Sequence, residues 1–81
     1  LTAFHALPLG THTGSFNGKA DVFSKSAFAH GKSWKLVAEE LGGTDYISLN
    51  LYDLTDGPRL FPCEMSTEKV VTFVCGLTVG G

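Results

Sequence analysis

The chain has 81 residues, of which 43% are hydrophobic and 17% are charged, and its formal net charge is −2 at pH 7. Two separate domains would each have too little interior to offset the entropy of ordering the chain, so we expect one domain over residues 1–81. The acidic pI of about 5.8 argues against the basic surface typical of proteins that bind nucleic acid or anionic membranes, and we expect neither partner.

The first thirty residues contain a clear turn signal, Asn17-Gly18, with alternating residues on either side. An Asn-Gly pair favours the tight turn of a β-hairpin, because both residues tolerate a positive φ. We therefore predict strands near 11–16 and 19–29. The glycine-rich stretch PLGTHTGSFNG matches neither common phosphate-binding loop pattern, and hairpin turns account for its composition.

The segment KSWKLVAEELGG at 32–43 has the apolar spacing of an amphipathic helix. Four residues fall at i, i+3, i+4 and i+7 and would form one apolar stripe: Trp34, Val37, Ala38 and Leu41. Ser33 can cap the first turn, and Gly42 or Gly43 can adopt the left-handed conformation that ends a helix. The pattern predicts a helix over 33–41.

The next segment, DYISLNLYDL at 45–54, has the two-residue period of a strand with one buried face. The following TDGP contains an Asp-Gly turn and a proline that sets the exit direction, so residues 59–63 are predicted to return antiparallel. Pro62 has no N–H to donate, which places it in an edge strand or at the end of its strand.

A second helix is predicted over 67–75. Ser66 can cap its N-terminus, and Glu68 in the first turn suits the positive end of the helix dipole. Its apolar residues repeat the spacing of one helical face: Val70, Phe73, Val74 and Leu77. Gly76 offers a stop.

Shifting the sequence by 33 residues superposes identical residues, including the serines that precede both predicted helices, Ser33 and Ser66. Self-similarity at a fixed period is typical of a repeated unit, so one hypothesis is a duplicated ββα unit. The alternative is chance, because two amphipathic helices capped by serine resemble each other. We predict an α+β fold, a two-layer sandwich in which a mainly antiparallel sheet of four or more strands packs against two helices.

The polar face of the predicted strand at 45–54 carries the candidate partner or ligand contacts: Tyr46, Ser48, Asn50 and Tyr52. Tyrosines combine apolar area with a hydrogen-bonding tip, which is the composition that interfaces favour. An equally weighted interpretation is that another segment of the chain, such as residues 1–9, covers them.

Cys63 is the residue with a catalytic interpretation. The shift of 33 residues places it at the position of His30, so both would lie at a strand-to-helix corner. A thiol near a helix N-terminus with a base beside it can act as a nucleophile, which makes Cys63, His30 and Glu64 candidates. A third group to orient the base is missing from the pattern, and a free cysteine more often packs as a small apolar residue.

The remaining cysteine and histidines suggest no site. Cys75 is predicted to pack at the edge of the core, and most of a helix separates it from Cys63, so a disulfide would require the hairpin to fold back along the helix. The spacings of His5, His12 and His30 match no compact ligand pattern, so we expect no metal site and no cofactor.

The residues themselves leave the function open between two classes. The high apolar content for so small a chain favours a non-enzymatic interaction module that self-associates as a homodimer, or that binds another protein or a small molecule. The alternative is a small enzyme or thiol-dependent binding protein that uses Cys63 with His30 or Glu64. The low cysteine count favours a reducing cytoplasm, and a removed signal peptide is the alternative.

Overall fold

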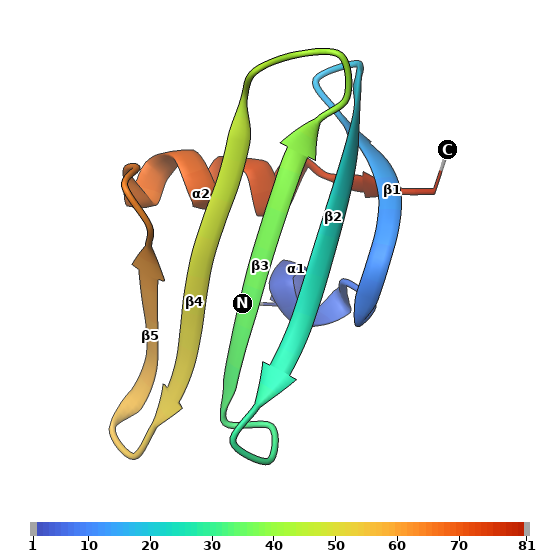
Figure 1. The fold of residues 1–81 in the computed structure, drawn as a ribbon. Helices are drawn as coiled ribbons and strands as arrows, with labels where there is room; N and C mark the ends of the chain where they lie inside the picture. The colour runs from blue at the N-terminus through green and yellow to red at the C-terminus, as the bar shows by residue number, and fades with distance from the viewer. Residues whose placement is uncertain (1, 81) are drawn as a thin grey trace.

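The computed structural model of the protein describes residues 2–80, which form an antiparallel six-stranded sheet with two helices (Figure 1). The strands are β1 (Gly10–Phe16), β2 (Lys19–Phe28), β3 (Ser33–Glu40), β4 (Tyr46–Leu54), β5 (Gly57–Pro62) and β6 (Thr78–Val79), in the spatial order β5-β4-β3-β2-β1-β6. The helices are α1 (Thr2–Ala6) and α2 (Thr67–Gly76). The predicted α+β class is therefore confirmed.

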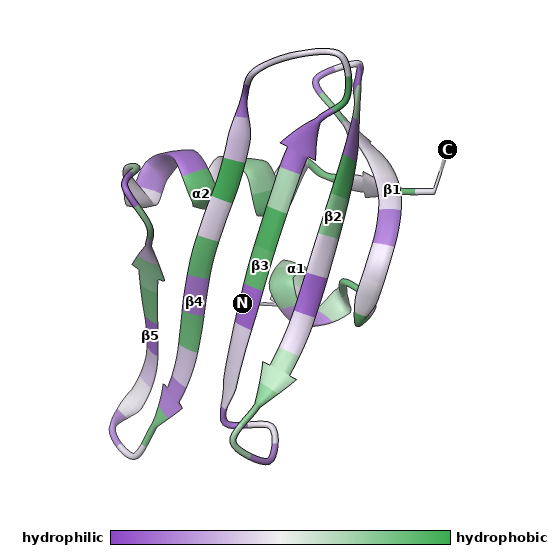
Figure 2. Cartoon of the chain, in the orientation of Figure 1, coloured by the Kyte–Doolittle hydropathy of each residue, from purple (hydrophilic) through white to green (hydrophobic). Residues whose placement is uncertain are grey.

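Both helices lie against the same face of the sheet (Figure 1). Along the strands, side chains alternate between this face and the other, and in Figure 2 the bands of β4 accordingly alternate between hydrophobic and polar colours. The side chains that face the helices form one core with them: Phe4, Leu7, Phe23, Leu36, Ala38, Ile47, Leu49, Leu51, Val70, Phe73 and Val74.

Local sequence signals correctly predicted five elements. Asn17 and Gly18 form the turn between β1 and β2 with φ values of 52° and 76°. The strand β4 and its antiparallel return β5 are as expected, and Pro62 ends β5 at the edge of the sheet. The helix α2 begins after Ser66, whose hydroxyl accepts a hydrogen bond from the Lys69 N–H at 3.1 Å.

The predicted helix over 33–41 was wrong, because residues Ser33–Glu40 form the strand β3. The same residues also fit a two-residue period, in which Trp34, Leu36 and Ala38 face the core while Lys35 and Val37 face away. Strands β2 and β4 pair with β3 on its two sides, so tertiary pairing satisfies its backbone groups and decides between the two periods.

The duplicated ββα unit is not confirmed. The register of 33 residues superposes β3 on the helix α2, so the two segments adopt different secondary structures. The matching serines have different roles, since Ser66 caps a helix whereas Ser33 pairs with Phe28 and Tyr52 within the sheet.

The sequence did not predict the short helix α1. Phe4 and Leu7 are buried against the sheet, and Leu7 closes the helix by donating its N–H to the Phe4 carbonyl at 3.1 Å. Residues 2–9, the described part of this segment, therefore lie on the core side of the sheet. Within residues 2–80, neither helix has the length and apolar character needed to cross a membrane.

Candidate functional site

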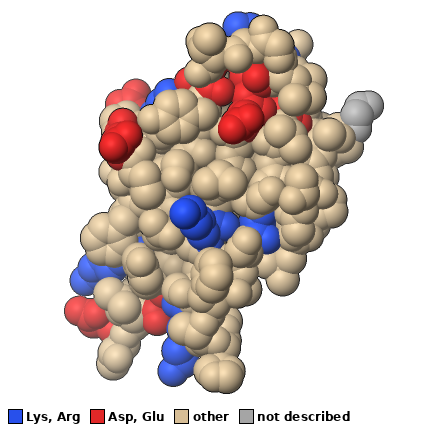
Figure 3. All heavy atoms as spheres, viewed as in Figure 1, with Lys and Arg blue, Asp and Glu red and all other residues tan. Residues whose placement is uncertain are grey.

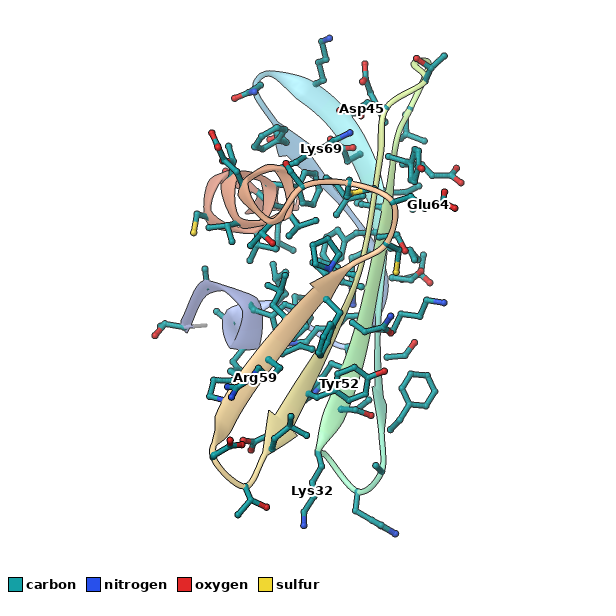
Figure 4. All side chains as sticks on the ribbon, turned by 90° about the vertical axis from the view of Figure 1, so that its left-hand side faces the viewer. Lys32, Asp45, Tyr52, Arg59, Glu64 and Lys69 are labelled. Atoms are coloured by element: carbon teal, nitrogen blue, oxygen red, sulfur yellow. The ribbon has the colours of Figure 1, made fainter. Side chains whose placement is uncertain are left out.

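The sheet has one face without helices, which we call the open face. The strands β2 to β5 contribute its side chains in alternation: Val22, Ser24, Ser26, Phe28, Ser33, Lys35, Val37, Glu39, Tyr46, Ser48, Asn50, Tyr52, Arg59 and Phe61. In the edge-on view of Figure 4, the helices lie on one side of the sheet and Tyr52 points to the other. No segment of residues 2–80 packs over this second side (Figure 4).

Large apolar side chains remain exposed on the open face. Their exposed fractions lie between 38% and 54%: Phe28, Val37, Tyr46, Tyr52 and Phe61. The rings of Tyr52 and Phe61 meet edge to face with centroids 5.5 Å apart, so they form an aromatic corner at the β4 and β5 side. Uncharged side chains occupy most of this face, with acidic groups gathered towards its upper end (Figure 3). Such a patch on a small domain marks a surface for association.

All four residues predicted as partner contacts lie on the open face. Tyr46 and Tyr52 are exposed, and Ser48 and Asn50 between them are half-buried. The competing interpretation, in which residues 1–9 cover the tyrosines, was wrong because α1 lies on the opposite side of the sheet.

The centre of the open face lies at Val37 and carries two opposite charges. Val37 has small neighbours on both sides, because it pairs with Ser24 of β2 and with Ser48 of β4. Lys35 and Glu39 flank it at equal spacing along β3 and point to the same side. Among residues 2–80, neither of these two side chains has an ion-pair partner.

Cys63 lies at the end of β5, half-buried beside the open face. Its N–H donates to the Ser48 carbonyl at 2.9 Å, and its sulfur lies 3.5 Å from the Asn50 amide nitrogen. Glu64 follows it as an exposed residue with a φ of 62°. These contacts place Cys63 next to two of the predicted contact residues.

The structure does not bring His30 to Cys63. His30 is exposed in the turn between β2 and β3, beyond the position of Tyr52, whereas Cys63 lies beside Ser48. Ser48 and Tyr52 alone are separated by roughly 13 Å along β4. The prediction that both residues occupy equivalent strand-to-helix corners was therefore wrong.

A second feature, which the sequence did not predict, is an acidic cleft between α2 and the ends of the β1–β2 and β3–β4 hairpins. Its inner part is a cavity of about 100 Å³ bordered by Asp21, Glu40 and Asp45, and it adjoins an outer cleft of about 460 Å³. The two parts share walls formed by Phe16 and Phe73, whose ring centroids are 5.0 Å apart.

The carboxylates of this cleft differ in their surroundings. The hydrogen bond that Lys69 donates at 2.7 Å lowers the pKa of Asp45 below its ordinary value of 3.8. Burial raises the pKa of Asp21, and the nearby charges of Glu40 and Asp45 raise it further. Glu40 lies 3.6 Å from the Lys19 ammonium.

Asp21 has a counterpart on the same strand, Lys25, and both are buried. Only 6% of Asp21 and 4% of Lys25 is exposed. The signal was present in the sequence, because Asp21, Phe23 and Lys25 occupy alternating positions of a predicted strand and must share one face. If Phe23 faces the core, then the charged side chains of Asp21 and Lys25 must face the same side of the sheet.

The cysteines and histidines make other contacts. Cys63 and Cys75 are free thiols. The His5 ring packs against Trp34 at 4.9 Å, and the His12 ring packs against Phe23 at 5.7 Å. In the part of the chain that the structure describes, no three His, Cys, Asp or Glu side chains are grouped to hold a metal ion.

Comparisons with known proteins gave no match: no protein-family model matches the chain, and no curated protein or solved structure is significantly similar to it. The arguments for function therefore depend on the geometry of the open face and of the acidic cleft.

Proposed function

We propose that the protein is a small non-enzymatic interaction module, a two-layer α+β sandwich that forms a homodimer through its open face. The observation that carries this proposal is the row of exposed apolar side chains on a sheet face that no described segment covers. Burial of such a patch against a second copy stabilises the pair by removing apolar area from water.

Lys35 and Glu39 on β3 support a second copy of this chain as the partner that covers the open face. A closed dimer has a two-fold axis, so the same surface must be complementary to itself. Consider two sheets stacked through their open faces, with the two-fold axis between them, parallel to the sheets and perpendicular to β3 at Val37. The β3 strands of the two copies then lie over each other and run antiparallel. Lys35 of each copy then meets Glu39 of the other, because both residues are two positions from Val37.

The small side chains around Val37 suit this packing. Stacked sheets lie about 10 Å apart, and Ser24 and Ser48 beside Val37 leave room for the facing valine. In the same arrangement Tyr46 lies over the Asn50 position of the other copy, so both predicted contact residues are used. Tyr52 and Phe61 then form the rim at the β5 side.

Sedimentation equilibrium at micromolar concentration tests the proposal. The expected mass is twice the 8.6 kDa of the chain. Lys35→Glu should weaken the dimer about tenfold or more, since two attractive pairs become repulsive, and the double variant Lys35→Glu/Glu39→Lys should restore it. Lys32→Glu, which makes the same charge change in the β2–β3 turn, is the matched control.

Two outcomes contradict the proposal. The first is a wild-type chain that sediments as a monomer. The second is a dimer that is unaffected by Lys35→Glu, or one that the double variant fails to restore, because either result places the interface elsewhere.

The two free thiols add a proposal about compartment. A chain with one exposed and one half-buried free cysteine is suited to a reducing cytoplasm, where thiols stay unpaired.

A further inference from the structure

The acidic cleft contains a carboxylate without a protein partner, on the largely buried residue Asp21, and its oxygens are not fully enclosed because they reach the cavity. Asp21 is 6% exposed, and within residues 2–80 its carboxylate has neither a hydrogen-bond donor nor a cation in contact. A buried carboxylate costs free energy unless a donor or a cation compensates it. Two lysines also line the cleft, and each pairs with a carboxylate other than Asp21: Lys19 with Glu40, and Lys69 with Asp45.

The cavity at Asp21 is open to a ligand from outside. Its volume of about 100 Å³ suits a small charged group, and it continues into the outer cleft of about 460 Å³. The walls that the two parts share are apolar at Phe16, Ile47 and Phe73 and polar at Asn17 and Asp45. Asp21 and Glu40 border only the inner part.

This combination selects one ligand chemistry. Acidic groups at the inner end favour a cation, and aromatic walls favour an apolar stem and also attract a cation to their ring faces. We infer that the cleft binds a small organic ammonium ion, with the ammonium group at Asp21 and the carbon stem between Phe16 and Phe73. This site lies on the helix side of the sheet, and Tyr46, which belongs to the open face, also borders its inner cavity.

The test uses n-butylammonium as the probe, with chemical-shift titration of the ¹H–¹⁵N spectrum of the full chain. The expected dissociation constant for so small a ligand is on the order of 1 mM, with shifts centred on Asp21, Phe16 and Phe73. Butan-1-ol and butyrate, which share the stem but lack the positive charge, should bind at least about tenfold more weakly.

Asp21→Asn removes the charge and keeps the shape of the side chain. It should weaken butylammonium binding at least about tenfold, whereas the matched control Asp56→Asn, in the exposed β4–β5 turn, should leave it unchanged. Glu40→Gln should weaken binding by a smaller factor, because Glu40 is already paired with Lys19.

The pH dependence gives a measurement that needs no variant. The charged groups of the cleft around Asp21 are Glu40 on β3, Lys19 on β2, Asp45 in the β3–β4 loop, and Glu68 and Lys69 on α2. The pKa of Asp45 is held low by Lys69 and the pKa of Asp21 is raised by burial, so loss of binding as the pH falls reports protonation of Asp21. Binding that is unchanged in Asp21→Asn, butan-1-ol binding as tight as butylammonium binding, or no binding at all would each overturn the inference.

Discussion

The ammonium group of Lys25 lies 2.7 Å from the carbonyl oxygen of Phe4 and 4.6 Å from the centre of its ring. The same group donates a second hydrogen bond to the Leu7 carbonyl at 2.9 Å, so one side chain of β2 holds the end of α1. Carbonyls at a helix C-terminus lack partners within the helix, and a lysine there satisfies them and suits the helix dipole. This contact fixes α1 to the sheet.

Lys25→Met should therefore destabilise the protein, although methionine fills a similar volume and is easier to bury. The reason is that the Leu7 carbonyl loses its lysine donor, which costs about 1 to 3 kcal/mol, while the Phe4 carbonyl keeps only the Leu7 N–H. Chemical denaturation measures the change in the free energy of unfolding, and Lys32→Met in the exposed turn is the control. A Lys25→Met variant as stable as the wild type would show that water replaces the ammonium group.

The pH dependence of Lys25 has a definite sign. Burial lowers its pKa below the ordinary value of 10.5. Between the two pKa values the unfolded state binds more protons, so the stability of the wild type relative to Lys25→Met should rise with pH up to about 10.5 and then level off. A difference that falls over this range would contradict the assignment.

Asp21 is predicted to reduce stability at neutral pH. Burial raises the pKa of Asp21 in the folded state above 3.8, its value in the unfolded state. Between the unfolded and the folded pKa, the folded state therefore binds more protons, and the free energy of unfolding falls as the pH rises through this range. Asp21→Asn should therefore raise the thermal midpoint at pH 7, and the gain should shrink as the pH approaches 3.8. Asp56→Asn is again the matched control. A constant difference across pH would indicate a purely steric effect.

Gly14 is predicted to be required for the attachment of β6. A Cβ atom at this position would lie 2.6 Å from the carbonyl oxygen of Thr78 and 3.1 Å from a methyl carbon of Leu77. Gly14→Ala should cost about 1 to 3 kcal/mol, as overpacking does, and should displace β6. Loss of protection against hydrogen exchange at the Gly80 N–H, which donates to Thr13, reports this displacement. Ser15→Ala, on the opposite face of β1, should leave that protection unchanged.

The two thiols are predicted to react at different rates. Cys75 is exposed, whereas Cys63 is half-buried beside the Asn50 amide, so iodoacetamide at neutral pH should alkylate Cys75 several times faster. Single-cysteine variants, Cys63→Ser and Cys75→Ser, assign each rate. Faster alkylation of Cys63 would instead favour the alternative of a reactive thiol that acts with Glu64.

Elements whose signals are local could be predicted from the sequence. Asn17-Gly18 specifies a hairpin turn through its backbone preference, and Ser66 specifies the start of α2 through its side-chain hydrogen bond. The candidate contacts Tyr46 and Tyr52 were found because strict alternation along β4 separates its two faces.

The segment 33–41 could not be assigned in the same way. Its residues fit a helical stripe through Trp34, Val37 and Ala38, and they fit a strand face through Trp34, Leu36 and Ala38. Pairing with both β2 and β4 decides for the strand, and this pairing depends on contacts between distant segments. The same helix prediction supported the hypothesis of a duplicated unit and the equivalent placement of His30 and Cys63.

By itself, the sequence determined the α+β class, the hairpin turns, the strand β4 with its two faces, and the capped helix α2. Only the tertiary structure decided that β3 is a strand and that α1 covers the core side and leaves Tyr46 and Tyr52 open. It also decided that Asp21 and Lys25 are both largely buried, and that Lys25 has the Phe4 carbonyl as an acceptor. The physical reason is the range of the interactions: turns and caps depend on neighbouring residues, whereas burial and strand pairing depend on which distant segments meet.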